Sequence, residues 1–127
     1  MPKTTKKVRA WLDIAMEDLS VAKDLFKAGR YVYCAFFCQQ AIEKLFKAMI
    51  IFETCQEPPY IHDLTVLAGI ARVDTSDEEK LRILTLHYIK GRYNTDRKKL
   101  PANSKKICKD LLSFTEEVFE CSLMKFK

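Results

Sequence analysis

The sequence predicts an all-α protein, an up-and-down bundle of four principal helices and one short helix. Apolar residues recur at the three- and four-residue spacing of amphipathic helices through most of the 127 residues. No segment shows the alternation of a strand, and glycines, prolines and capping residues divide the chain into five helical segments. The length suits one core, so we expect residues 1–127 to form a single domain, with residues 1–6 as a flexible basic arm.

Helical periodicity is clearest in the first half of the chain. From residue 6 to about residue 28 it is carried by Val8, Trp11, Leu12, Ala15, Leu19, Ala22 and Phe26. Gly29 marks the end of this helix, and a second pattern follows from residue 31 to residue 54, before Pro58 and Pro59. Two long helices joined by so short a turn have to pack antiparallel.

Two further helices are predicted in the second half. A short one, within residues 60–70, begins through His62 and Asp63 and has an apolar side of Leu64, Leu67 and Ile70. The next begins with a capping-box signature, in which Glu79 follows Ser76 by three residues, and it ends at Gly91.

The last predicted helix follows a polar, basic connection. Asn103 or Ser104 can cap its N-terminus. Its apolar face carries Ile107, Leu111, Phe114 and Val118.

Composition excludes several classes of protein. The longest apolar run, residues 31–38, is shorter than the roughly 18 residues of a membrane span, and no signal-peptide core follows the basic N-terminus. We therefore expect a cytoplasmic protein. The five cysteines are odd in number and lie mostly among apolar residues, which is typical of reduced core thiols. Cys34 and Cys38 lie one helical turn apart without a second ligand pair, so packing is favoured over metal binding, and we expect neither a metal nor a cofactor.

A polar stripe interrupts the second helix, whose other sides are apolar enough for the centre of a bundle. It comprises Gln40, Glu43, Lys44 and Lys47, with Gln39 at its edge. Periodicity alone favours a solvated face with a Glu43–Lys47 ion pair. The alternative is a partly polar interface, either with a second subunit or with a loop of the same chain, because Tyr33 and Phe36 continue the same stripe.

Basic residues concentrate between residues 90 and 106. This segment contains one acid, Asp96, and seven basic residues, which give it a net charge of +6 in a chain of +5: Lys90, Arg92, Arg97, Lys98, Lys99, Lys105 and Lys106. Such a cluster attracts the phosphates of RNA or a nucleotide, or an acidic partner surface. Tyr93 can stack on a base beside Arg92. We expect binding through Arg92, Tyr93, Arg97, Lys98 and Lys99; the alternative is a solvated charged loop.

The two histidines lack spaced partners. We expect His62 to order the start of the short helix rather than to act as a ligand or base. His87 lies one turn before Gly91, where an imidazolium would complement the end of a helix.

The order of "AGRYVYCAFFCQQAIEKLFKAMI", "HDL" and "YIKGRYN" before a final amphipathic helix resembles the HEPN domain family, over about residues 11–119. The most specific part is the run of Gln39, Gln40, Glu43, Lys44, Lys47 and Ala48; His62 belongs to the "HDL" element. The resemblance implies a helical bundle that commonly dimerises and is often encoded beside a minimal nucleotidyltransferase, in a two-component system of toxin-antitoxin type.

Many members of this family are metal-independent ribonucleases with an Arg-x(4–6)-His motif, and the chain departs from that motif. After Arg92, the positions for the histidine hold Arg97, Lys98 and Lys99, whereas both histidines precede Arg92. A guanidinium remains protonated and cannot accept the proton of a 2′-hydroxyl group. We therefore expect this protein to be a homodimer that acts as the partner of a nucleotidyltransferase. We do not expect it to be an efficient enzyme itself. A ribonuclease toxin with an atypical motif and a purely structural interaction module remain the alternatives.

Overall fold

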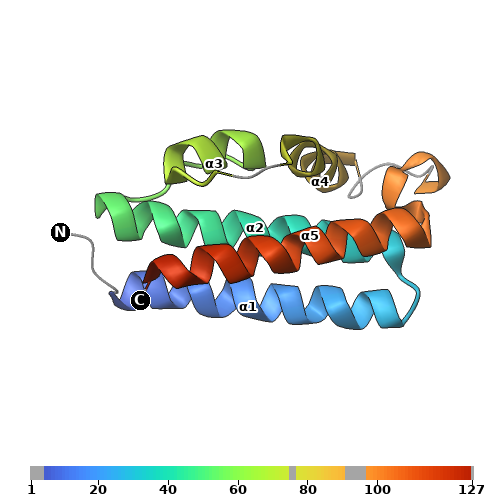
Figure 1. The fold of residues 1–127 in the computed structure, drawn as a ribbon, viewed down its shortest axis with the longest axis horizontal. Helices are drawn as coiled ribbons and strands as arrows, with labels where there is room; N and C mark the ends of the chain where they lie inside the picture. Colours follow the sequence, from blue (N-terminus) through green and yellow to red (C-terminus); the bar gives the residue numbers. More distant parts are fainter. Residues whose placement is uncertain (1–4, 75–76, 91–96, 127) are drawn as a thin grey trace.

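The computed structural model describes residues 5–74, 77–90 and 97–126. These ranges contain five α-helices and no strand (Figure 1), which confirms the predicted all-α bundle. The helices are α1 (Lys6–Lys27), α2 (Tyr31–Thr54), α3 (Leu64–Ala71), α4 (Glu78–Lys90) and α5 (Lys105–Leu123). Three short 3₁₀ turns accompany α5: η1 (Arg97–Lys99), η2 (Pro101–Asn103) and η3 (Met124–Phe126).

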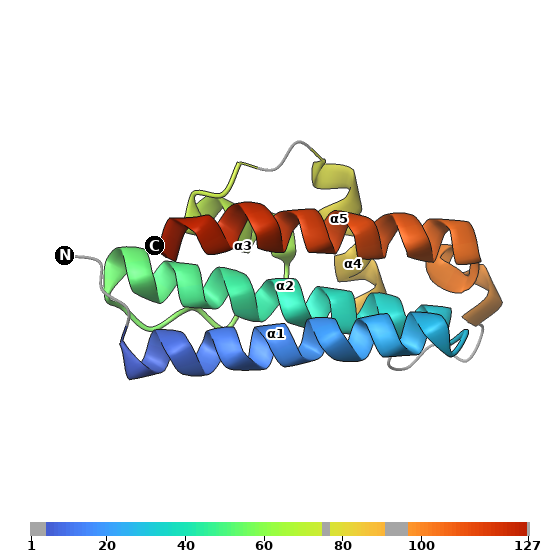
Figure 2. The same ribbon diagram turned by 60° about the horizontal axis from the view of Figure 1, so that its bottom comes forward.

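Helix α2 is the centre of the bundle. It contacts every other α-helix, with its most extensive contact to the antiparallel α1. Helices α1, α2 and α5 lie side by side, while α3 and α4 lie across the other side of α2 (Figures 1 and 2). Because neighbours surround α2, most of its side chains are buried, as its almost continuous apolar sequence predicts.

The turn between α1 and α2 shows how the sequence ends one helix and begins the next. Gly29 has a φ of 78°, in the left-handed region that favours glycine. The amides of Gly29 and Arg30 donate to the carbonyls of Phe26 (3.0 Å) and Leu25 (2.8 Å), which closes the last turn of α1. The chain can therefore reverse within three residues.

Side chains cap the other helix starts. Thr5 caps α1, Asp63 caps α3 and Ser104 caps α5. The helix α1 thus begins within the arm expected at residues 1–6, whose first four residues lie outside the described ranges. For α4, the Asp77 carboxylate accepts from the Lys80 amide at 3.2 Å, and the expected capping residue Ser76 is not described.

Two predicted core positions are wrong. Ile70 is 41% exposed and Ile107 is 38% exposed. Helix α3 turns Ala68 and Ala71 inward instead, and α5 turns Cys108 inward. A pattern search for large apolar residues misses such small buried residues.

The described helices include none with both the length and the apolar character needed to cross a bilayer. Cys34, Cys38 and Cys108 are buried free thiols, whereas Cys55 and Cys121 are exposed. Within the described ranges no three His, Cys, Asp or Glu residues form a group that could hold a metal ion.

Candidate functional site

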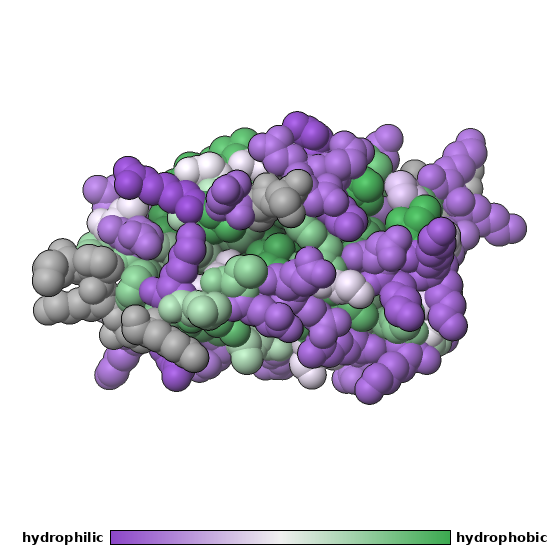
Figure 3. Space-filling model, in the orientation of Figure 1, coloured by the Kyte–Doolittle hydropathy of each residue, from purple (hydrophilic) through white to green (hydrophobic). Residues whose placement is uncertain are grey.

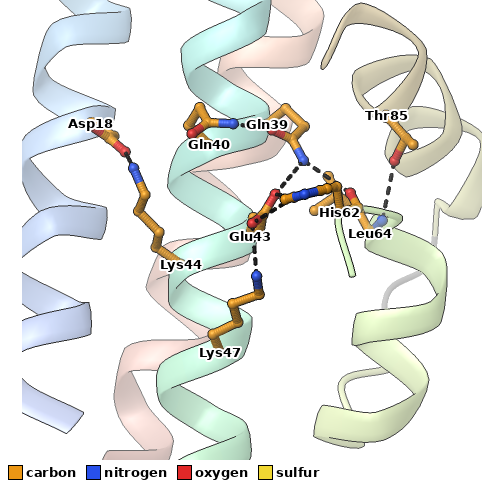
Figure 4. Close-up of polar contacts among 9 residues, drawn as sticks. All are labelled: Asp18, Gln39, Gln40, Glu43, Lys44, Lys47, His62, Leu64 and Thr85. Carbon is orange, nitrogen blue, oxygen red and sulfur yellow. Dashed lines mark hydrogen bonds and ion pairs between the residues drawn. The ribbon is translucent and has the colours of Figure 1, made fainter. Parts of the chain in front are cut away.

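A buried carboxylate on the central helix organises the polar residues of the predicted stripe. Glu43 is 6% exposed and accepts hydrogen bonds from three side chains (Figure 4). Gln39 Nε2 and Lys47 Nζ each donate from 2.9 Å, one helical turn before and after Glu43. The third donor is His62 Nδ1, 3.0 Å from Oε1 and 3.1 Å from Oε2. Glu43 thus joins α2 to the segment that precedes α3.

Gln39 makes the same connection through the backbone. Its Nε2 donates to the carbonyl oxygen of His62 at 3.0 Å, while its Oε1 accepts from Gln40 Nε2 at 2.8 Å. Gln39 is fully buried, so all its polar partners come from the protein. Both the ring and the main chain of His62 are therefore fixed on α2.

These contacts correct the interpretation of the stripe as a solvated face. Gln39, Glu43 and Lys47 are buried, and the alternative of a loop of the same chain is the observed arrangement. Lys44 is half-buried and pairs with Asp18 of α1, on another side of the helix (Figure 4). Periodicity could not find this, because it describes one helix and not the segment that folds back onto it. The stripe therefore gives no support to the predicted homodimer. That prediction now depends on the resemblance to the HEPN family.

The pKa of Glu43 reflects two opposing effects. Burial raises it, because a carboxylate loses hydration in the protein interior. Hydrogen bonds from Gln39, Lys47 and His62 outweigh burial and lower the pKa below its ordinary value. Glu43 is therefore an anion that balances the charge of the buried Lys47 ammonium group.

His62 lies where α2, α3 and α4 meet. Its side chain is 46% exposed, and its ring stacks on Tyr88 of α4. Nearby, the Leu64 amide at the start of α3 donates to Thr85 Oγ1 of α4 at 3.1 Å (Figure 4). His62 thus orders the start of α3, and part of its ring is also accessible to solvent.

His87 has a different role from the one predicted. It is fully buried, with Nδ1 2.9 Å from the Ile83 carbonyl oxygen and Nε2 3.1 Å from the Ala102 amide. Since the amide can only donate, Nε2 accepts and Nδ1 carries the proton. Burial lowers the pKa of His87, so the neutral ring connects α4 to η2. The expected imidazolium at the end of α4 is wrong, because the ring is buried against Ala102 of η2 and stays neutral.

Part of the basic segment, η1, lies at one end of the bundle (Figure 1). Lys98 and Lys99 in η1 are exposed. Of the other expected binding residues, Arg92 and Tyr93 lie outside the described ranges, and Arg97 is described only as part of η1. Their binding roles remain predictions.

The fold adds two basic residues that the sequence pattern did not single out. Lys27 and Arg30 are exposed at the α1–α2 turn, at the same end of the bundle as η1 and the start of α5 (Figures 1 and 2). A hydrogen bond from Cys108 Sγ to the Tyr31 carbonyl oxygen, at 3.4 Å, joins α5 to α2 there. Hydrophilic side chains cover much of this end (Figure 3). Only the folded bundle reveals this proximity, since about 70 residues separate the two segments.

Comparisons with known proteins define the class to which this helical bundle belongs. The HEPN domain model matches residues 8–125, so the chain belongs to the HEPN domain family. The fold is similar to that of TT1696 from Thermus thermophilus, a crystal structure, with a TM-score of 0.78 and 22% identity over 95% of this chain and 99% of that one. No curated protein sequence matches the chain.

Proposed function

We propose that this protein is the helical partner of a minimal nucleotidyltransferase in a toxin-antitoxin-type system. We also propose that it binds RNA or a nucleotide through its basic end, the end of the bundle that carries Lys27, Arg30, Lys98 and Lys99. Membership of the HEPN family supports a nucleotide- or RNA-related domain. The enzyme partner and the two-component system follow from the resemblance of the sequence motifs to that family.

The observation that carries the binding proposal is the concentration of positive charge. Residues 90–106 have a net charge of +6, and within this segment the exposed Lys98 and Lys99 of η1 lie at the same end of the bundle as Lys27 and Arg30 (Figure 1). The N-terminus of α5, with its partial positive charge, begins at this end too. Phosphate groups are the natural ligands of such a surface, and counterion release makes their binding dependent on salt.

Binding without efficient cleavage follows from the histidines. The positions after Arg92 hold no histidine. His87 cannot take a proton from a substrate, because it is fully buried and both ring nitrogens have partners in the protein. The usual catalytic arrangement of the family's ribonucleases is therefore not available to this chain.

The test is RNA binding as a function of salt concentration. We expect single-stranded RNA to bind with a log-log salt slope of roughly −0.7 for each phosphate contact. Replacing Arg92 and Arg97 together by alanine weakens binding and flattens the slope. Lys6→Ala with Arg9→Ala is the matched control, because these exposed residues lie at the start of α1, at the opposite end of the bundle (Figure 1).

Two outcomes would contradict the proposal. Robust metal-independent cleavage of single-stranded RNA by the wild type, abolished by Arg92→Ala, would establish the ribonuclease alternative. If the wild type neither binds nor cleaves RNA, the remaining role of the basic residues is to dock an acidic partner protein. Co-purification with the product of a neighbouring nucleotidyltransferase gene tests that role.

A further inference from the structure

Three aromatic rings form a stack beside the central helix. The rings of Phe36 on α2 and Tyr88 on α4 are nearly parallel, with centroids 5.9 Å apart and an interplanar angle of 9°. His62 continues the stack on Tyr88, with centroids 4.6 Å apart and an angle of 28°. The imidazole of His62 is therefore an aromatic surface held by its neighbours, and not a freely rotating side chain.

The hydrogen bonds of His62 determine which of its nitrogens can meet a ligand. The Glu43 carboxylate can only accept, so Nδ1 carries a proton and donates to it. In the neutral ring, Nε2 is then the acceptor, and it makes no hydrogen bond to any residue in the described ranges. Tyr88 stacks on one face and Glu43 accepts from the Nδ1 edge, yet the side chain as a whole is still 46% exposed, which leaves the opposite face and the Nε2 edge for a ligand.

His87 shows what a purely structural histidine looks like in the same protein. It has no exposed surface, and both of its ring nitrogens are bonded. His62 likewise carries a proton on Nδ1, but its side chain is 46% exposed and its Nε2 has no partner in the described ranges. This is a preorganised arrangement for a ligand that has a flat face and a hydrogen-bond donor.

The distance between the stack and the basic end is short enough for one ligand to contact both. Tyr88 lies two residues before Lys90, where the basic segment begins. Gln39, which contacts His62, is eight residues from the start of α2, which corresponds to about 12 Å along the helix. A strand of several nucleotides can span this distance with its phosphates on the basic residues.

We propose that His62 is a ribonucleotide-binding residue, in which an unpaired base stacks on the open face of the imidazole and Nε2 accepts a hydrogen bond from a 2′-hydroxyl group. The inference rests on the proposed RNA binding and assigns it a second contact. Unpaired bases commonly stack on aromatic side chains, including histidine, and the 2′-hydroxyl is the group that distinguishes RNA from DNA.

Nuclear magnetic resonance of the two imidazoles tests the proposal on the wild-type protein. We expect a short oligoadenylate, roughly six nucleotides long, to shift the His62 ring signals, while those of the buried His87 stay unchanged. Adenosine monophosphate shows whether the base is recognised as part of a strand or as a free nucleotide. If it is recognised as part of a strand, the oligoadenylate shifts the His62 ring signals at a lower concentration than adenosine monophosphate does. Inorganic phosphate shifts neither ring.

Variants separate stacking from hydrogen bonding. His62→Phe keeps an aromatic face, so it retains binding of the DNA counterpart, oligodeoxyadenylate, but loses the preference for RNA over DNA. His62→Ala loses the face as well and binds both strands about tenfold more weakly. Tyr60→Ala is the matched control, since Tyr60 is a fully exposed aromatic residue on the same segment.

The outcomes distinguish this inference from the proposed function. If the oligoadenylate binds with a normal salt dependence but leaves the His62 signals unchanged, the stacking site is refuted and binding by the basic end stands. An unchanged RNA preference in a folded His62→Phe protein also refutes the contact to Nε2. If no strand binds at any salt concentration, both proposals fail together.

Discussion

Replacing His87 by phenylalanine tests how the end of α4 is held to the connection that precedes α5. His87 and Ala102 are both fully buried, and Nε2 is the acceptor for the Ala102 amide. Phenylalanine keeps an aromatic ring at this position but has no acceptor, so the amide remains buried without a partner. We expect the free energy of unfolding to fall by about 1–3 kcal/mol at neutral pH.

The same substitution removes a pH dependence. Burial lowers the pKa of His87 in the folded state, whereas in the unfolded chain it is about 6.5. The neutral ring therefore contributes its full stability above about pH 6.5, and this is lost as the pH falls toward the folded-state pKa, because the unfolded chain binds the proton first. The slope reaches at most about 1.4 kcal/mol per pH unit for one proton.

Urea unfolding at a series of pH values measures both effects. The difference in unfolding free energy between wild type and His87→Phe should shrink as the pH falls below about 6.5. Contributions that the two proteins share cancel in that difference. His87→Gln is the matched control: its amide oxygen can replace Nε2 as the acceptor, so it should be more stable than His87→Phe and lack the titration. Identical pH profiles of wild type and His87→Phe would refute the buried neutral ring.

Two further predictions concern the central helix and the assembly. Glu43→Gln leaves the buried Lys47 ammonium without its anion and should lower the free energy of unfolding by about 3–5 kcal/mol; the exposed Glu53→Gln should change it by less than about 0.5 kcal/mol. A small effect of Glu43→Gln in urea unfolding would mean that the pair is hydrated. Light scattering should give the mass of a homodimer, as expected from the family resemblance, and a monomer at high micromolar concentration would contradict it.

The sequence by itself determined the helical segments and the ends of the two long helices, α1 and α2. The ranges predicted for α1 and α2 match those observed within one residue, because long apolar periodicity and the Gly29 turn are local signals. The central place of α2 was also predictable, since a helix that is apolar over most of its circumference has to be covered on most sides. Where a helix is short, as in α3, its apolar phase was predicted less well.

Only the tertiary structure decided what the polar residues do. Gln39, Glu43 and Lys47 have the spacing of a solvated stripe, yet the segment containing His62 folds back over them and supplies their partners. His87 has the position of a helix-end cation, yet the chain 15 residues later covers it and makes it neutral. Both outcomes depend on contacts between residues far apart in the sequence. The charge state and exposure of a side chain follow from what packs against it, and the periodicity of its own helix does not contain that information.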